Sequence, residues 1–161
     1  RKEGTDISKI TIDVLDQYGY SNNEAKIFLQ CFDSKELKRI KNELNSSLPL
    51  IQLIGNNSWG ESEDDYNFMV TENGIKGVSK YAVGIGPYLQ LSYNVSLKGR
   101  DYKPTPMIKY ARQYDLLIHP YTIRKDSIPL DFFDYKEMIQ WFTNTLKADG
   151  LFTDFVDLTE I

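Results

Sequence analysis

Chemically versatile side chains in this sequence gather where short apolar runs end. Gln30, Cys31 and Phe32 close a run that starts at Ile27, and Asp33 follows it. Later runs end in a similar way, at Gln52-Leu53-Ile54-Gly55-Asn56, Gly86-Pro87-Tyr88, His119-Pro120-Tyr121-Thr122-Ile123-Arg124-Lys125 and Phe152-Thr153-Asp154. Amides, hydroxyls, a guanidinium group and aromatic rings together suit a polar or anionic small molecule. The pattern predicts a binding rim without specifying a reaction.

Histidine and cysteine are nearly absent, and this limits the chemistry that the chain can perform. The 161 residues contain one histidine, His119, and one cysteine, Cys31. Two-histidine mechanisms and metal sites, disulfides within the chain and cysteine zinc clusters are therefore excluded for this sequence. We expect His119 to be a packed neutral histidine and Cys31 a small buried apolar residue.

Several of the polar residues also have an ordinary structural explanation. Asp33 and Asp154 each precede an expected helical segment, so helix capping is favoured over acid catalysis. Gln30 and Gln52 lie inside apolar runs. They could be hydrogen-bonded amides in a barrel interior, an alternative as strong as ligand binding.

Two charged segments leave alternatives open as well. Arg124 and Lys125 lie just beyond an expected strand, where they could bind an anion or form a solvated surface pair. Residues 61–65 are rich in carboxylates, but an exposed loop is a better explanation for this run than a cation site.

Composition places the chain among ordinary globular domains. Its 161 residues have a mass of 18.7 kDa and include 41% apolar residues, which suits one packed domain. The 19 basic and 23 acidic residues give a net charge of −4, without the positive excess that nucleic-acid binding requires. No apolar run approaches the roughly 20 residues of a membrane helix. We expect no nucleic-acid partner and no membrane span.

Hydrophobic periodicity predicts helices that alternate with strands. The first helix is expected over residues 7–18, with an apolar stripe of Ile7, Ile10, Val14 and Leu15. Further helices are expected after Asp33, over residues 72–81, from Thr105 to Tyr114 and after Asp134, and strands are expected to start near residues 27, 50, 83, 116 and 150. The segments between, 55–68 and 88–103, are expected to be connections.

This alternation predicts an α/β fold with a parallel sheet. The strands are apolar at consecutive positions, which is typical of a parallel sheet covered on both sides. Two architectures remain, a doubly wound sheet and a (βα)8 barrel. No glycine-rich phosphate loop follows any strand, which weakens the nucleotide-binding version of the first. A barrel needs about 250 residues, so these strands would form only its C-terminal part.

Several separated motifs resemble the glycerophosphodiester phosphodiesterases, in particular their longer bacterial branch of periplasmic and surface-lipoprotein members. The motifs are Leu29-Gln30-Cys31-Phe32-Asp33 with residues 36–40, Val83-Gly84-Ile85-Gly86-Pro87, residues 119–126, residues 150–155, and the opening Glu3-Gly4-Thr5-Asp6-Ile7 with Tyr18-Gly19-Tyr20. They cover nearly the whole chain, in order and with similar spacing. The chain is identified by this resemblance as the C-terminal portion of a member.

The resemblance implies a (βα)8 barrel, of which residues 1–161 would supply strands four to eight and leave it incomplete. It implies hydrolysis of glycerophosphodiesters, such as glycerophosphocholine, to glycerol 3-phosphate and an alcohol. It also implies a divalent cation, Ca²⁺ or Mg²⁺, and two histidines as acid and base. The family motifs that carry these groups are absent from this sequence. They are expected upstream of Arg1, and no catalytic or metal-binding residue is expected within the chain.

The resemblance further implies five substrate-binding residues: Tyr121, Phe32, Gln30, Phe152 and Arg124. Tyr121 occupies the place of an aromatic residue that lines the glycerol pocket in relatives. Phe32, Gln30 and Phe152 match positions at the barrel mouth. Arg124 departs from the pattern, because shorter relatives tend to have a polar residue there.

Two functions remain open on the sequence. In the first, the chain works in a phosphodiesterase together with the substrate and the missing N-terminal half of the barrel, and it is inactive alone. In the second, it is a non-catalytic half-barrel whose open sheet edges bind another chain, including a second copy in a homo-oligomer. The family branch implies a periplasmic or cell-surface location, with a cytoplasmic one left open.

Overall fold

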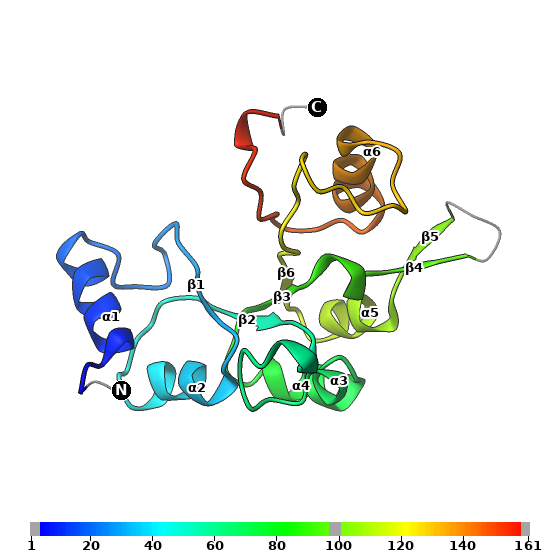
Figure 1. The fold of residues 1–161 in the computed structure, drawn as a ribbon. Helices are drawn as coiled ribbons and strands as arrows, with labels where there is room; N and C mark the ends of the chain where they lie inside the picture. Colours follow the sequence, from blue (N-terminus) through cyan, green and yellow to red (C-terminus); the bar gives the residue numbers. More distant parts are fainter. Residues whose placement is uncertain (1–3, 97–100, 159–161) are drawn as a thin grey trace.

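A parallel sheet of four strands forms the centre of the molecule (Figure 1). The computed structural model describes residues 4–96 and 101–158, so Arg1 to Glu3, at the opening motif, lie outside the described residues. The strands are ordered β1 (Leu29–Cys31), β2 (Leu50–Ile54), β3 (Gly84–Pro87) and β6 (Leu117–Ile118). The α/β fold and the parallel direction of the sheet are confirmed.

Helices cover one face of this sheet. Figure 1 shows α2 (Ser34–Asn42), α3 (Tyr66–Met69), α4 (Glu72–Val78) and α5 (Pro106–Gln113) along the same side of the strands. Every residue of β2 and β3 is buried, so both faces of these two strands are covered, as the consecutive apolar positions predict. Strands that succeed one another along the chain are also neighbours in this sheet, and their order across the sheet never reverses. A barrel has this order, whereas a doubly wound sheet has a reversal point.

The main core lies between the sheet and these helices. Ile54, Ile85 and Ile118 are completely buried and belong to one apolar cluster with Leu37 of α2 and Ile75 of α4. Burying each of these aliphatic side chains contributes about 1.5–3 kcal/mol to the transfer free energy of folding. The core therefore holds the strands by their helix-covered face.

The other face of the sheet is built around a glycine. Gln30, Ile51, Gly84 and Leu117 stand in register, one from each strand. A Cβ atom at Gly84 would lie 2.7 Å from Ile51 Cδ1 and 2.8 Å from Leu117 Cβ. Only glycine therefore lets the flanking side chains close over β3. Gln30, at the edge of this row, is exposed.

Helix α1 (Ile7–Gln17) forms where the periodicity predicts it, but its apolar stripe is not covered. Ile7 is 69% exposed, Ile10 is 50% exposed, and no residue of the helix is fully buried. Asp6 caps the helix and also accepts a hydrogen bond of 2.7 Å from Arg39 Nη2 of α2. This ion pair joins the start of α1 to α2, and Ile12 of α1 packs against the core cluster.

The expected strand near residues 150–154 does not form. One parallel bridge joins Ile123 and Thr153. The Phe152 amide donates to the Pro120 carbonyl at 3.0 Å, and the Ile123 amide donates to the Phe152 carbonyl at 2.7 Å. The two partners of Phe152 are thus three positions apart in sequence, whereas a regular parallel ladder has partners on alternate residues. The described sheet consequently has four strands and not five.

Two short structures occur within expected connections. Residues 88–103 contain an antiparallel pair, β4 (Tyr93–Val95) and β5 (Tyr102–Pro104), and the earlier connection contains α3. Each strand has only three residues, which is too short for an alternating pattern to be recognised. The pair buries Tyr93 and Tyr102 against the C-terminal helical region.

Helix α6 (Tyr135–Gln140) begins at its predicted cap and continues as a π-helical turn (Trp141–Thr145). Asp134 Oδ1 accepts a hydrogen bond of 2.8 Å from the Glu137 amide. Met138 and Phe142 are completely buried. In the described part of the chain, no helix combines the length and apolar character that crossing a membrane would require.

Candidate functional site

One aromatic ring follows each strand of the sheet at its carboxyl end. Phe32 follows β1, Tyr88 follows β3 and Tyr121 follows β6. Trp59 lies in a 3₁₀ turn, Asn57–Trp59, that follows β2. Phe32 and Tyr121 meet edge to face with centroids 5.8 Å apart, and Trp59 and Tyr88 do so at 4.8 Å. Tyr88 and Tyr121 are 6.2 Å apart and complete the group. These four residues are called the aromatic box below.

The loop after β2 places Trp59 by local contacts. Asn56 begins the 3₁₀ turn, and its Oδ1 accepts a hydrogen bond of 2.9 Å from the Ser58 amide. A Cβ atom at Gly55 would lie 2.9 Å from Trp59 Cε3 and 3.3 Å from Phe32 Cε1. The absence of a side chain at Gly55 therefore allows the Trp59 ring to lie against the backbone beside Phe32.

Tyr121 is held by its backbone and its hydroxyl group. Its amide donates to the Pro87 carbonyl at 3.1 Å, and its carbonyl accepts from the Leu89 amide at 3.0 Å. Its hydroxyl donates to the Ile54 carbonyl at 3.1 Å. Burial raises the pKa of Tyr121, so the hydroxyl remains a neutral donor at physiological pH. The ring, more than the hydroxyl, is available to a ligand.

A cavity of about 270 Å³ adjoins the box between Tyr88, Tyr121 and Arg124. The remaining lining residues are Leu89, Gln90, Thr122, Ser127, Ile128 and Pro129. A hollow of this size, with aromatic, hydroxyl and guanidinium groups in its wall, suits a small polar molecule.

Arg124 is neutralised by two carboxylates. Its Nη2 lies 2.7 Å from Asp126 Oδ2, and its Nη1 donates to Asp154. The hydrogen bond with Asp126 is the main cause that raises the pKa of Arg124. Asp154 thus pairs with Arg124, just before the following 3₁₀ turn (Val156–Leu158). An anion at Arg124 would have to compete with one of these carboxylates.

Gln30 and Phe152 lie in different surroundings from the box. Gln30 is exposed on the sheet face without helices. Phe152 packs against His119 at a centroid distance of 6.4 Å, and Phe28 packs against the same ring at 4.8 Å. Burial lowers the pKa of His119, which agrees with the expected packed neutral histidine. The structure therefore groups Phe32, Tyr121 and Arg124, and places Phe152 beside His119.

Gln52 and Asp33 have structural roles. Gln52 is completely buried, its Nε2 donates to the Phe32 carbonyl at 2.8 Å, and its Oε1 accepts from the Tyr81 hydroxyl at 2.7 Å. It is a satisfied amide as expected, but it faces the helices and not a barrel interior. Asp33 caps α2 by accepting a hydrogen bond of 2.8 Å from the Lys35 amide.

The acidic run over residues 61–65 is also occupied by local contacts. Asp64 accepts hydrogen bonds of 2.7 Å from both the amide and the hydroxyl of Ser34. Asp65 caps α3. Within residues 4–96 and 101–158, no three side chains of His, Cys, Asp or Glu are grouped so that they could hold a metal ion. The divalent cation implied by the resemblance finds no ligand set in this part of the chain.

Comparison with known proteins identifies the family. Residues 1–158 match the glycerophosphoryl diester phosphodiesterase family. The chain belongs to this family. The glycerophosphodiester phosphodiesterase of Haemophilus influenzae is 37% identical, over 97% of this chain and 47% of the relative. The enzyme of that name from Treponema pallidum is 30% identical, over 98% of this chain and 48% of the relative. The chain spans about half the length of these curated relatives.

The family membership gives the position of the aromatic box a meaning. In barrel enzymes the active site lies at the carboxyl ends of the parallel strands, where the box is found. The sequence predicts Phe32 and Tyr121 as substrate-binding residues and places Tyr88 at the rim without such a role. It does not single out Trp59. Tyr88 directly follows an apolar strand, which is a usable signal, whereas Trp59 reaches the box only through the turn after Gly55.

Proposed function

We propose that this protein is the C-terminal portion of a glycerophosphodiester phosphodiesterase and supplies strands four to eight of its (βα)8 barrel. Completed by a preceding half, the enzyme would hydrolyse a glycerophosphodiester to glycerol 3-phosphate and an alcohol. The observation that carries the proposal is the aromatic box at the carboxyl ends of a sequentially ordered parallel sheet, in a chain of this family. A relative named for the same activity adds support.

The residues of the site would bind substrate and leave the chemistry to other groups. The rings of Tyr121 and Phe32 can cover the apolar carbons of glycerol. Arg124 can meet the phosphoryl anion if that anion replaces Asp126 or Asp154, since guanidinium groups bind carboxylate and phosphate in similar geometry. Gln30 and Phe152 would contribute at the mouth once the barrel is closed.

We assign the acid–base histidines and the ligands of the divalent cation, Ca²⁺ or Mg²⁺, to a segment that precedes Arg1 in the intact enzyme. When bound, such a cation would polarise the phosphoryl oxygens. The 161-residue chain alone would then be inactive, because general acid–base catalysis alone is worth about 10²–10⁴-fold. A periplasmic or cell-surface location, by similarity to the family branch, is part of the same proposal.

A chimera tests this function. The N-terminal half of the Haemophilus influenzae relative is joined ahead of Arg1, and release of glycerol 3-phosphate from glycerophosphocholine is measured with Ca²⁺. We expect the chimera to release glycerol 3-phosphate and the 161-residue chain to release none. Release by the chain alone would contradict the division of roles, and release of phosphocholine in place of glycerol 3-phosphate would contradict the reaction.

An assembly module is the second candidate, because α1 presents an uncovered apolar stripe. Ile7, Ile10 and Val14 are each at least 44% exposed, next to a sheet whose outer strand is β1. Such surfaces favour association with another chain. Light scattering of the purified chain separates the candidates. A stable dimer of the 18.7 kDa chain supports homo-oligomeric assembly, and a monomer contradicts it.

A further inference from the structure

The Trp59 ring of the aromatic box is open to solvent. Trp59 is 43% exposed, whereas Trp141, the other tryptophan, is 8% exposed. The planes of Trp59 and Tyr88 meet at 78°, and those of Phe32 and Tyr121 meet at 87°. Rings at nearly right angles form adjoining walls and not a closed stack, so the box offers aromatic faces to a ligand.

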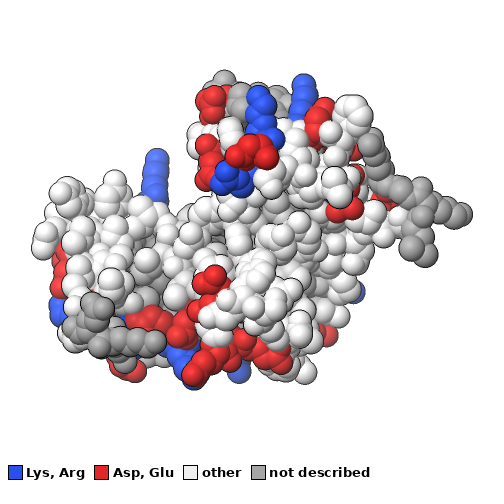
Figure 2. All heavy atoms as spheres, in the orientation of Figure 1, with Lys and Arg blue, Asp and Glu red and all other residues white. Residues whose placement is uncertain are grey.

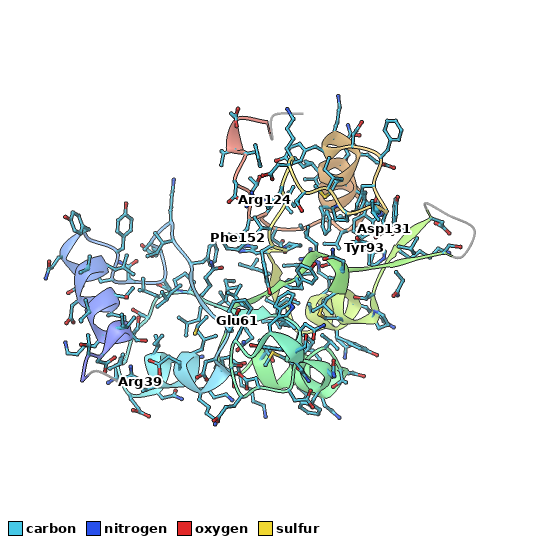
Figure 3. All side chains as sticks on the ribbon, in the orientation of Figure 1. Arg39, Glu61, Tyr93, Arg124, Asp131 and Phe152 are labelled. Carbon is cyan, nitrogen blue, oxygen red and sulfur yellow. The ribbon has the colours of Figure 1, made fainter. Side chains whose placement is uncertain are left out.

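An acidic residue, Glu61, stands beside these walls, two positions after Trp59. Figure 3 labels Glu61 near the middle of the molecule, and Figure 2 shows acidic side chains there, with an uncharged surface above and further charged side chains below. Burial is the main cause that raises the pKa of Tyr121, and the charge of Glu61 acts in the same direction. Glu61 is therefore within electrostatic range of the box.

Glu61 differs in its pairing from its neighbour Glu63. Glu63 lies 2.6 Å from Lys35 Nζ in an ion pair. Among the ion pairs of the described residues, none involves Glu61. Its charge is thus available to a ligand, and the same charge disfavours a phosphate group at this end of the box.

Aromatic walls with one unpaired carboxylate match one ligand class better than others. The negative faces of tryptophan and tyrosine rings attract cations that carry methyl groups, and a nearby carboxylate adds a charge without requiring a hydrogen-bond donor. A primary ammonium group would need several acceptors at hydrogen-bond distance, which carbon walls do not provide. The chemistry therefore favours a quaternary ammonium group.

We propose that Trp59, Tyr88 and Glu61 bind the trimethylammonium group of a choline-type alcohol, and that they make choline-containing glycerophosphodiesters the preferred substrates. The inference rests on the proposed function, because it concerns the alcohol part of that substrate. Phe32 and Tyr121, which are less exposed than Trp59, remain the walls for glycerol. The cavity beside Arg124 is lined by Tyr88 and Tyr121 but not by Trp59, and it suits the phosphoryl group.

Fluorescence titration of the 161-residue chain tests the site without requiring hydrolysis. Trp59 is the exposed reporter, and buried Trp141 supplies a constant background. Choline is compared with 3,3-dimethyl-1-butanol, a neutral molecule of the same shape, at constant ionic strength. We expect choline to bind about 2- to 30-fold more tightly, the range that corresponds to a cation–π contribution.

Matched variants separate the charge from the fold. Glu61→Gln should weaken choline binding several-fold and leave the neutral alcohol unaffected. Glu63→Gln, a carboxylate of the same loop that is already paired, should change neither affinity. Tyr88→Leu should weaken choline while Trp59 still reports. Equal affinity for choline and the neutral alcohol, or no effect of Glu61→Gln in a variant with unchanged melting temperature, would overturn the proposal.

The chimera keeps this inference distinct from the proposed function. If it hydrolyses glycerophosphocholine and glycerophosphoglycerol equally well, the headgroup assignment is wrong and the phosphodiesterase assignment stands. If the chain binds choline but the chimera hydrolyses nothing, the proposed function is wrong and the trimethylammonium site stands.

Discussion

The molecule contains two aromatic clusters of similar composition and opposite character. The aromatic box lies at the carboxyl edge of the sheet, with Trp59 43% exposed. A second cluster, between the β4–β5 pair and α6, is buried throughout and consists of Tyr93, Tyr102, Phe132, Trp141 and Phe142. Ring type alone therefore does not separate a binding surface from a core. The environment of each ring does.

The contacts of the two clusters explain the difference. In the buried cluster, Tyr102 and Phe132 stack with centroids 4.6 Å apart, and the Tyr93 hydroxyl donates to Asp131 at 3.0 Å (Figure 3). These contacts join the β4–β5 pair to the C-terminal region. The rings of the box are instead carried one by one on segments that follow separate strands. Removing a ring should affect folding in the first cluster and binding in the second.

The largest effect is expected from Phe142→Ala in the buried cluster. Phe142 is completely buried, so its truncation removes apolar contacts and leaves a cavity. We expect a loss of about 3–5 kcal/mol in the free energy of unfolding, measured by urea denaturation. A loss below about 1 kcal/mol would show that this cluster is not a structural core.

Tyr121 should show the opposite behaviour in the intact enzyme. Tyr121→Ala should raise KM with little change in kcat, because it removes binding made equally in the ground and transition states. The loss of binding free energy should be about 1–3 kcal/mol. Tyr121→Phe keeps the ring and should retain most of the substrate affinity, since the hydroxyl bonds to Ile54. Steady-state kinetics and melting temperatures are measured together. An unchanged KM with a large drop in melting temperature would place Tyr121 with the core residues.

His119 lies between aromatic rings and can titrate, so it should make stability depend on pH. Burial lowers its pKa below the ordinary value of 6.5, while Asp149 opposes this shift in part. The unfolded chain then binds the proton more readily, so stability is complete above pH 6.5 and falls as the pH drops below it. Urea denaturation between pH 7.5 and 5.5 should show this fall, and His119→Phe should remove it. Equal slopes in both proteins would contradict the burial of the imidazole.

The smallest effect on stability is expected from Trp59→Leu in the box. The exposed ring should contribute no more than about 1 kcal/mol to the free energy of unfolding. Urea denaturation is compared with that of Phe142→Ala under the same conditions. Similar losses for the two variants would remove the distinction between the clusters.

Local chemistry explains which parts of the fold and site the sequence predicts. Asp33 and Asp134 act within a few residues, and both cap helices as expected. The apolar run of β2 predicts a fully buried strand, and each of its residues is buried. Tyr121 was found because it follows a strand of a recognisable motif. Trp59 was missed because its position depends on packing against Gly55, which no nearby pattern encodes.

Charged groups at the rim show the same limit. Arg124 pairs with Asp154, thirty positions away, and this contact changes the predicted anion site. The irregular backbone pairing of Phe152 likewise ends the sheet one strand early. Such contacts arise only after distant segments are brought together.

Helices α1 and α5 illustrate what each level of structure decides. For both, the apolar spacing and the terminal residues determined a helix, since these terms act within one or two turns. Met107, Ile108 and Ala111 of α5 are buried in the core, while Ile7 and Ile10 of α1 remain exposed. The sequence by itself determined that each helix has an apolar face and that the chain forms a parallel α/β sheet. Only the tertiary structure decided which faces are covered and which rings meet, because burial depends on contacts between residues far apart in the chain.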